Sequence, residues 1–236
     1  MTLTTTLKWI YGPASCYRLP SDRTLHPKQL AEQLSQQQIQ QSDLVYGHAL
    51  FGLHRHLDCS CRYFTMLRDP VRRVASHYFY HKERYPNSPL SSNRAGLPSN
   101  GDSLLLRSTK PLRNDFAAFG LTERFDESLF LFRNRLDWRS LPFYVRRKVN
   151  SKRPAVEELP ADTVEAVQQQ NLLDTDLYRF AKKHFERTIN AEFSGLNPTL
   201  SRFRRWNRLA QSVAPPLLWL YRTGRSLLPG LRTPEH

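Results

Sequence analysis

The stretch from Tyr63 to His81 constrains the fold more than any other part of the sequence, because it predicts a strand, a tight turn and a helix in succession. Residues 62–68 form a strand-like apolar run. Asp69 and Pro70 follow it, and proline is tolerated in the first turn of a helix that an aspartate can cap. Apolar side chains then recur at helical spacing, at Val71, Val74, Ala75, Tyr78 and Phe79. This order is half of a βαβ unit, so we expect a parallel sheet.

A second buried strand is predicted at residues 43–47, which combine apolar, β-branched and aromatic side chains and end at a glycine. Helices are expected at 27–41, 114–120, 122–134, 160–170 and 174–190, a strand-like run at 141–148, irregular chain at 1–26 and a long loop at 85–112. The alternation of strands and helices predicts an α/β fold. Ligands of such sheets bind outside the carboxyl ends of the strands, which makes Gly47-His48 and Arg68-Asp69 the first candidates for a site.

The charge balance favours an acidic partner. Lys and Arg number 35 against 21 Asp and Glu, a net charge of +14. Nucleic acid, a phosphorylated or sulfated ligand and an anionic lipid surface would all suit this excess, and charge alone does not choose among them.

The number of cysteines and the length of the apolar runs exclude several classes of protein. Three cysteines exclude a disulfide framework and a four-cysteine zinc site, and they favour unpaired thiols in a reducing compartment. The apolar runs near either end are far shorter than the about 20 residues that a membrane span requires, and the start lacks the apolar core of a signal peptide. We therefore expect no transmembrane span and no metal, and the oligomeric state is not visible in the sequence.

Arg68 and Ser76 flank a candidate phosphate cradle. Arg68 ends the predicted strand, Ser76 lies in the following helix, and the helix N-terminus between them exposes backbone N–H groups. The alternative is that Arg68 pairs with a carboxylate and Ser76 faces a neighbouring helix.

Five segments, in order over residues 44–190, resemble the family 2 sulfotransferases, which include the heparan sulfate and uronyl 2-O-sulfotransferases and many bacterial relatives. The segment at 64–80 resembles the 3′-phosphate-binding segment of that family. The other matching segments lie at 47–54, 120–128, 144–154 and 171–178. The resemblance implies a P-loop NTPase-like parallel sheet flanked by helices. It also implies transfer of a sulfuryl group from 3′-phosphoadenosine 5′-phosphosulfate (PAPS) to a hydroxyl, usually of a saccharide or acidic glycan, with 3′-phosphoadenosine 5′-phosphate (PAP) as product.

The resemblance gives roles to three residues at the strand ends. Arg68 and Ser76 would hold the 3′-phosphate of the nucleotide, and His48 falls where the family has its catalytic base. A histidine can take the proton of a sugar hydroxyl near neutral pH. The alternative for His48 is a core histidine bonded to backbone.

A basic loop follows the strand-like run at 141–148. In the family this loop closes over the nucleotide or contacts an acidic acceptor. By loose alignment Arg146 would contact the acceptor, and Arg147, Lys148, Ser151 and Lys152 would contact the nucleotide. The alternative is a solvated run of charge.

One expected motif is not found. The family carries a 5′-phosphosulfate loop, approximately Pro-Lys-Thr-Gly-Ser/Thr-Thr, after its first strand. Pro27-Lys28 lacks the following Gly, Ser or Thr, and residues 7–12 resemble the far end of the helix that follows that loop. The chain therefore resembles a family member that begins after its first strand, through a misassigned start or a real truncation.

Two other functions stay open. One is a catalytically dead nucleotide- or glycan-binding remnant, and the other is a nucleic-acid-binding basic protein, although no signature of the latter is visible and we expect no nucleic-acid partner.

We divide the chain into a sulfotransferase-like domain at 1–196 and a basic, aromatic tail at 197–236. The tail could lie on an anionic membrane or pack its apolar side chains on the core. The expected location is cytoplasmic, with the Golgi lumen as the alternative if an N-terminal anchor has been lost.

Overall fold

The computed structural model describes residues 2–20, 26–34, 36–48, 50–85, 109–144, 154–193, 198–209 and 211. The first part of the chain alternates short strands and helices. Its elements are α1 (Thr2–Tyr11), η1 (Pro13–Ser15), β1 (Cys16–Arg18), α2 (Pro27–Gln33), α3 (Gln36–Gln40) and β2 (Leu44–Tyr46). The expectation of irregular chain at 1–26 was wrong, because this stretch holds α1 and β1. The helix expected at 27–41 is divided into α2 and α3.

The strand–turn–helix unit at the centre of the sequence is confirmed. After η2 (Leu53–His56), strand β3 (Tyr63–Leu67) leads into α4 (Pro70–Arg84). Asp69 caps α4, since its side chain accepts a hydrogen bond of 2.9 Å from the N–H of Arg72. Val71, Val74 and Ala75 are buried, as their spacing predicted.

The last part of the chain is mostly helical. Its elements are α7 (Thr109–Asn114), β4 (Phe116–Leu121), η3 (Thr122–Arg124), α8 (Phe125–Arg135), η4 (Val156–Glu158), α9 (Ala161–Gln170) and α10 (Leu172–Glu192). A further helix occupies 198–209. The helices expected at 122–134, 160–170 and 174–190 are confirmed, while the helix expected at 114–120 is strand β4. Residues 141–144 form no strand.

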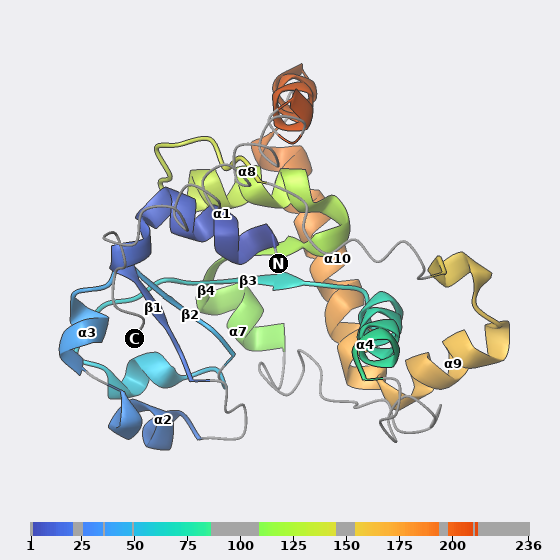
Figure 1. The fold of residues 1–236 in the computed structure, drawn as a ribbon, viewed down its shortest axis with the longest axis horizontal. Coiled ribbons are helices and arrows are strands. Elements are labelled where there is room, and N and C mark those ends of the chain that lie inside the picture. The colour runs from blue at the N-terminus through green and yellow to red at the C-terminus, as the bar shows by residue number, and fades with distance from the viewer. Residues whose placement is uncertain are drawn as a thin grey trace, which may run out of the picture.

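The four strands of the described chain form two separate parallel pairs. β1 pairs with β2, and β3 pairs with β4. The mixed α/β class and the parallel pairing are therefore confirmed, but the described strands do not join into one continuous sheet. In Figure 1, α1 and α8 lie on one side of the β3–β4 pair and α7 lies on the other.

The main core forms around β3, β4, α8 and α10. Leu129 and Phe132 of α8 and Phe185 of α10 are almost fully buried in it. Gly120 allows β4 to lie close to α8, because a Cβ at this position would fall 2.5 Å from the Cβ of Ser128. The close packing lets the Ser128 hydroxyl accept from the N–H of Leu121 at 2.8 Å.

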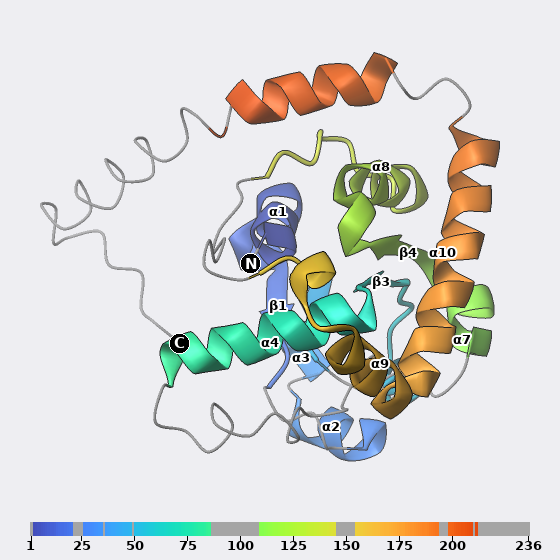
Figure 2. The ribbon, with the colours of Figure 1, turned by 90° about the vertical axis from the view of Figure 1, so that its right-hand side faces the viewer.

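The helix at 198–209 packs on the same core. Leu200 and Phe203 are buried, and the Phe203 ring lies edge-on to Phe130 of α8. Figure 2 shows this helix, in orange-red, beyond α8 and α1. None of the helices in the described residues is long and apolar enough to cross a membrane.

Candidate active site

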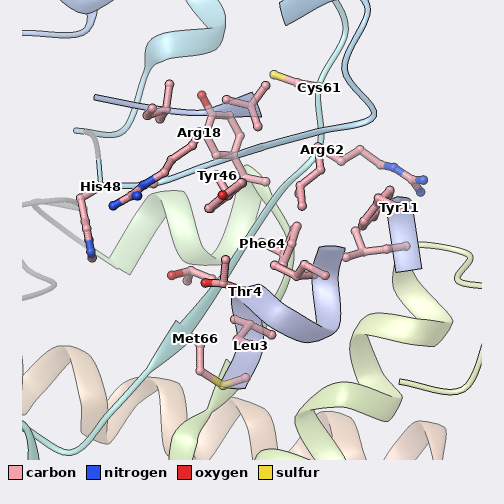
Figure 3. A pocket seen from close by; sticks show the side chains of 18 of the residues that line it. Leu3, Thr4, Tyr11, Arg18, Tyr46, His48, Cys61, Arg62, Phe64 and Met66 are labelled. Atoms are coloured by element: carbon pink, nitrogen blue, oxygen red, sulfur yellow. The ribbon is translucent and has the colours of Figure 1, made fainter. Parts of the chain in front are cut away.

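A cavity of about 1810 Å³ lies between the two strand pairs. Its wall is formed by α1, by β2 and β3 along their whole lengths, and by the segments that follow β1, β2 and β3 (Figure 3). His48 and Arg68 both line it. Two candidate residues from different strand ends, 20 positions apart in the sequence, therefore share one cavity.

Gly47 sets the position of His48. The N–H of Leu19 donates to the carbonyl of Tyr46 at 2.9 Å, so β1 and β2 stay paired up to their carboxyl ends. A Cβ at residue 47 would lie 2.7 Å from the Cβ of Leu19, closer than real Cβ atoms approach. Glycine therefore lets the chain pass Leu19 and present His48, which is exposed, at the edge of the cavity.

Arg18 is a cavity residue that the sequence did not reveal. It ends β1, is exposed, and lines the cavity. Figure 3 shows its side chain on the same side of the cavity as His48. A strand of three residues is too short to produce a period-two pattern, and this is why the signal was missed.

The turn after β3 is fixed by groups from the end of β4. The hydroxyl of Thr122 donates to the carbonyl of Leu67 at 3.0 Å, and the N–H of Asp69 donates to the carboxylate of Glu123 at 3.2 Å. Arg68 lies between these two points and is half-buried. The turn therefore presents Arg68 to the cavity from a backbone that is held on both sides.

Ser76 does not line the cavity. It lies almost two turns into α4 and is half-buried. The structure thus brings Arg68 and His48 to one cavity, whereas Ser76 lies beyond the first turn of α4 and outside the cavity wall.

Two side chains of α10 support the first turn of α4. Asp174, buried, forms an ion pair with Arg73, and Tyr178 donates to the second carboxylate oxygen of Glu123 at 2.9 Å. Asp174 and Tyr178 are four residues apart, so they lie on one helix face. This spacing, with the buried Leu177 between them, is the sequence signal that could have identified Asp174 and Tyr178. Neither residue was predicted to have a role.

Tyr178 stays a hydrogen-bond donor at neutral pH. Burial raises the pKa of its hydroxyl above the usual value, and the adjacent carboxylate of Glu123 raises it further. The protonated hydroxyl therefore holds Glu123 against the turn throughout the neutral range.

The basic loop predicted to bind nucleotide and acceptor lies outside the described residues. This applies to Arg146, Arg147, Lys148, Ser151 and Lys152. The structure does describe Tyr144, which precedes the loop and lines the cavity. Its hydroxyl donates to Asp126 at 2.7 Å, and its N–H donates to the side chain of Asn207 at 3.0 Å.

Within the described ranges, no three or more His, Cys, Asp or Glu side chains are grouped so that they could hold a metal ion. The chemistry available at the cavity is that of an exposed imidazole and several cations. An imidazole can accept a proton from a hydroxyl, and an arginine can bind a phosphate or sulfate oxygen with two parallel hydrogen bonds.

A family model described as galactose-3-O-sulfotransferase matches residues 90–210. The match covers more than half of the chain and includes β4, α8, α9, α10 and the helix at 198–209. It begins after α4, so it does not include His48, Arg68 or Ser76. Neither a curated protein nor a solved structure matches the chain at a significant level.

The chain belongs to the galactose-3-O-sulfotransferase family. It is an enzyme, a transferase that moves sulfate to carbohydrate. The sulfotransferase class expected from the sequence is confirmed, whereas the family match does not support the narrower likeness to heparan sulfate and uronyl 2-O-sulfotransferases.

Proposed function

We propose that the chain transfers the sulfuryl group of PAPS to the 3-hydroxyl of a galactose unit and releases PAP. The observation that carries this proposal is the shared cavity of His48 and Arg68, each at the carboxyl end of a parallel strand. The description of the matching family supports galactose as the acceptor. A P-loop NTPase-like sheet is the fold that we propose for the complete site.

His48 serves as the base in this proposal. The acceptor oxygen forms a bond to sulfur while the bond between sulfur and the bridging oxygen of the 5′-phosphate breaks. The acceptor's proton passes to the imidazole of His48, and the electron pair of the broken bond stays on the phosphate of PAP. A positioned base of this kind contributes about 10²–10⁴-fold to the rate.

Arg68 carries most of the 3′-phosphate binding in this proposal. The first turn of α4 offers few unused amides, because Pro70 has none, the N–H of Asp69 binds Glu123 and that of Arg72 binds Asp69. The guanidinium of Arg68 is a strong, charged donor beside this turn. Ser76 would add a weaker, neutral hydrogen bond.

Binding of PAP tests the nucleotide site. We expect Arg68→Ala to weaken PAP binding about 10- to 150-fold in calorimetry, which corresponds to about 1.5–3 kcal/mol for a hydrogen bond to a charged group. Ser76→Ala should weaken it by less than about 10-fold. Arg205→Ala removes the same charge from an exposed position outside the cavity wall and is the matched control. Equal losses for Arg68→Ala and Arg205→Ala would reduce the effect to net charge and contradict the assignment.

Turnover separates the enzyme from a binding remnant. His48→Ala should keep PAP affinity and lose sulfate transfer by at least about 10²-fold. Binding of PAP by the unaltered chain without any transfer would support the remnant.

The acceptor position is tested with matched sugars. An oligosaccharide with terminal galactose should be sulfated, and the same oligosaccharide with 3-deoxygalactose should not. Sulfation of the deoxy sugar at an equal rate would exclude the 3-hydroxyl as the acceptor.

A further inference from the structure

Among the described residues, exposed apolar side chains concentrate on three neighbouring segments away from the cavity. The segments are α1, residues 139–143 and the helix at 198–209. Trp9 of α1 is 73% exposed and Trp206 of the last helix is 60% exposed. Single apolar side chains on a surface are ordinary, whereas a group of them marks a site of interaction.

Phe143 connects the three segments. Its carbonyl accepts from the hydroxyl of Thr6 in α1 at 3.4 Å, and its ring stacks on Phe203 at 5.7 Å between ring centroids. Figure 2 shows the chain after α8 running between α1 and the helix that contains Phe203. Trp9 follows Thr6 by three positions, and Trp206 follows Phe203 by three, a spacing that places each pair on one side of its helix. The two tryptophans therefore flank Phe143.

Two leucines extend the same exposed side. Leu141 and Phe143 are exposed while the residue after each is buried, so both side chains point away from the protein. Leu209 is exposed and stands three positions beyond Trp206 on its helix. We call these five side chains the apolar face: Trp9, Leu141, Phe143, Trp206 and Leu209.

The charge around the apolar face has one sign. None of the three segments contains Asp or Glu, and their basic residues are Lys8, Arg139, Arg202, Arg204, Arg205 and Arg208. Arg204 is paired with Asp126 of α8. Arg139, Arg202 and Arg205 are exposed and form no ion pair with a described residue. The apolar face therefore lies in a region of positive charge.

This combination suits an anionic lipid surface. A second copy of the chain on this face would bring the same arginines against one another, and like charges repel. A nucleic acid would match the arginines with phosphates but would give the leucines no apolar partner. A bilayer interface offers both phosphates and acyl chains, and tryptophan is enriched at that depth.

We propose that the apolar face and its arginines form a peripheral binding surface for membranes that contain anionic phospholipids. Trp9, Phe143 and Trp206 enter the boundary between headgroups and acyl chains, while Arg202 and Arg205 bind lipid phosphates. The contact is reversible. With so few inserted side chains, its affinity lies near that of a single myristoyl chain, about 10⁴ M⁻¹.

Sedimentation with vesicles tests the surface on the full chain. One preparation is phosphatidylcholine alone, and the other is equal parts of phosphatidylcholine and phosphatidylserine. We expect binding to the anionic vesicles to be at least about tenfold stronger and to weaken as salt is added. Equal binding to the two preparations, or binding to neither, would overturn the proposal.

A paired variant tests the arginines. Arg202→Gln with Arg205→Gln should weaken binding to the anionic vesicles about 30-fold, because each basic residue near such a surface contributes about 1 kcal/mol, or about fivefold. Lys82→Gln with Arg84→Gln removes the same charge from exposed positions at the end of α4 and is the matched control. Equal losses in the two variants would reduce the effect to net charge and reject the surface.

Lipids brominated in their acyl chains identify the tryptophans that enter the bilayer, because bromine quenches tryptophan fluorescence on contact. Trp9→Phe with Trp206→Phe keeps two aromatic rings on the face, so it should keep most of the binding and lose most of the quenching. Trp138 is buried, and Trp219 lies outside the described residues. Quenching that persists in this variant would assign the contact to another part of the chain and contradict the proposal.

Two further measurements separate the other occupants. Trp206→Ala should weaken vesicle binding at least about fivefold, and Tyr85→Ala, which removes another exposed aromatic ring, should not. A loss in Trp206→Ala that is confined to random-sequence DNA would assign the face to nucleic acid. A dimer in ultracentrifugation that Trp206→Ala converts to a monomer would assign it to a second copy. None of these measurements involves sulfate transfer, so the result stands apart from the proposed function.

Discussion

Asp174→Ala removes the buried carboxylate that ties α10 to the first turn of α4. The Asp174 side chain is 4% exposed and that of its partner Arg73 is 23% exposed. Breaking a buried ion pair costs about 3–5 kcal/mol, and the partial exposure of Arg73 favours the lower end. We therefore expect a loss of about 3 kcal/mol in the free energy of unfolding, or about 6–12 °C in the thermal midpoint for a chain of this size.

The control lies two residues further along the same helix. Asp176 pairs with Arg179 at 2.6 Å, but both side chains are mostly exposed. Asp176→Ala makes the same change of charge and should cost less than about 1 kcal/mol. Urea denaturation, followed by tryptophan fluorescence, measures both variants.

A double variant separates ion pairing from packing. Arg73→Met with Asp174→Leu replaces the pair by apolar side chains and should be more stable than Asp174→Ala, because it leaves no buried charge without its counterion. The reasoning is refuted if Asp174→Ala costs no more than Asp176→Ala, or if the double variant is the least stable of the three.

Two further predictions concern β3 and β4. Gly120→Ala should lower the free energy of unfolding by about 1–3 kcal/mol in urea denaturation, since the new Cβ would fall 2.5 Å from that of Ser128; an unchanged midpoint would contradict the close contact. Burial raises the pKa of Tyr63 from 10.0 to about 12. Because the pKa is higher in the folded state, the stability linked to this hydroxyl is present below pH 10 and is lost as the pH rises toward 12. Tyrosinate absorbance should show one step near pH 12 that is missing in Tyr63→Phe, and its persistence in that variant would refute the assignment.

The sequence predicted the elements whose signals are local. The turn at Asp69-Pro70 sets the start of α4 through one side chain and one ring, so neighbouring residues suffice to locate it. The amphipathic pattern of α10 is equally local, with Leu177, Ala181 and Phe185 buried on one face.

Strand β4 was mistaken for a helix because its residues do not favour a strand by themselves. Phe116 and Phe119 stand at helical spacing with two alanines between them. Pairing with β3 and the close approach of Gly120 to α8 outweigh that preference. Both contacts come from parts of the chain that a local pattern does not include.

The sequence placed the candidate residues His48 and Arg68 at strand ends, and the structure brings both to one cavity, while their roles stay predictions. The supporting groups were missed because each acts over a long sequence separation. Glu123 binds the N–H of Asp69 across 54 positions, and Asp174 binds Arg73 across 101. A single sequence contains no record of such pairings.

Tyr144 connects the helix at 198–209 to the wall of the cavity. Its backbone N–H is held by Asn207, and the carboxylate that accepts from its hydroxyl, Asp126, also accepts from Arg204 at 2.9 Å. Deleting the chain after residue 196 would remove both contacts from a residue in the cavity wall and would uncover the Phe130 ring against which Phe203 packs. A chain shortened to residue 196 is therefore expected to lose stability and solubility together, and a useful deletion series should begin beyond residue 209.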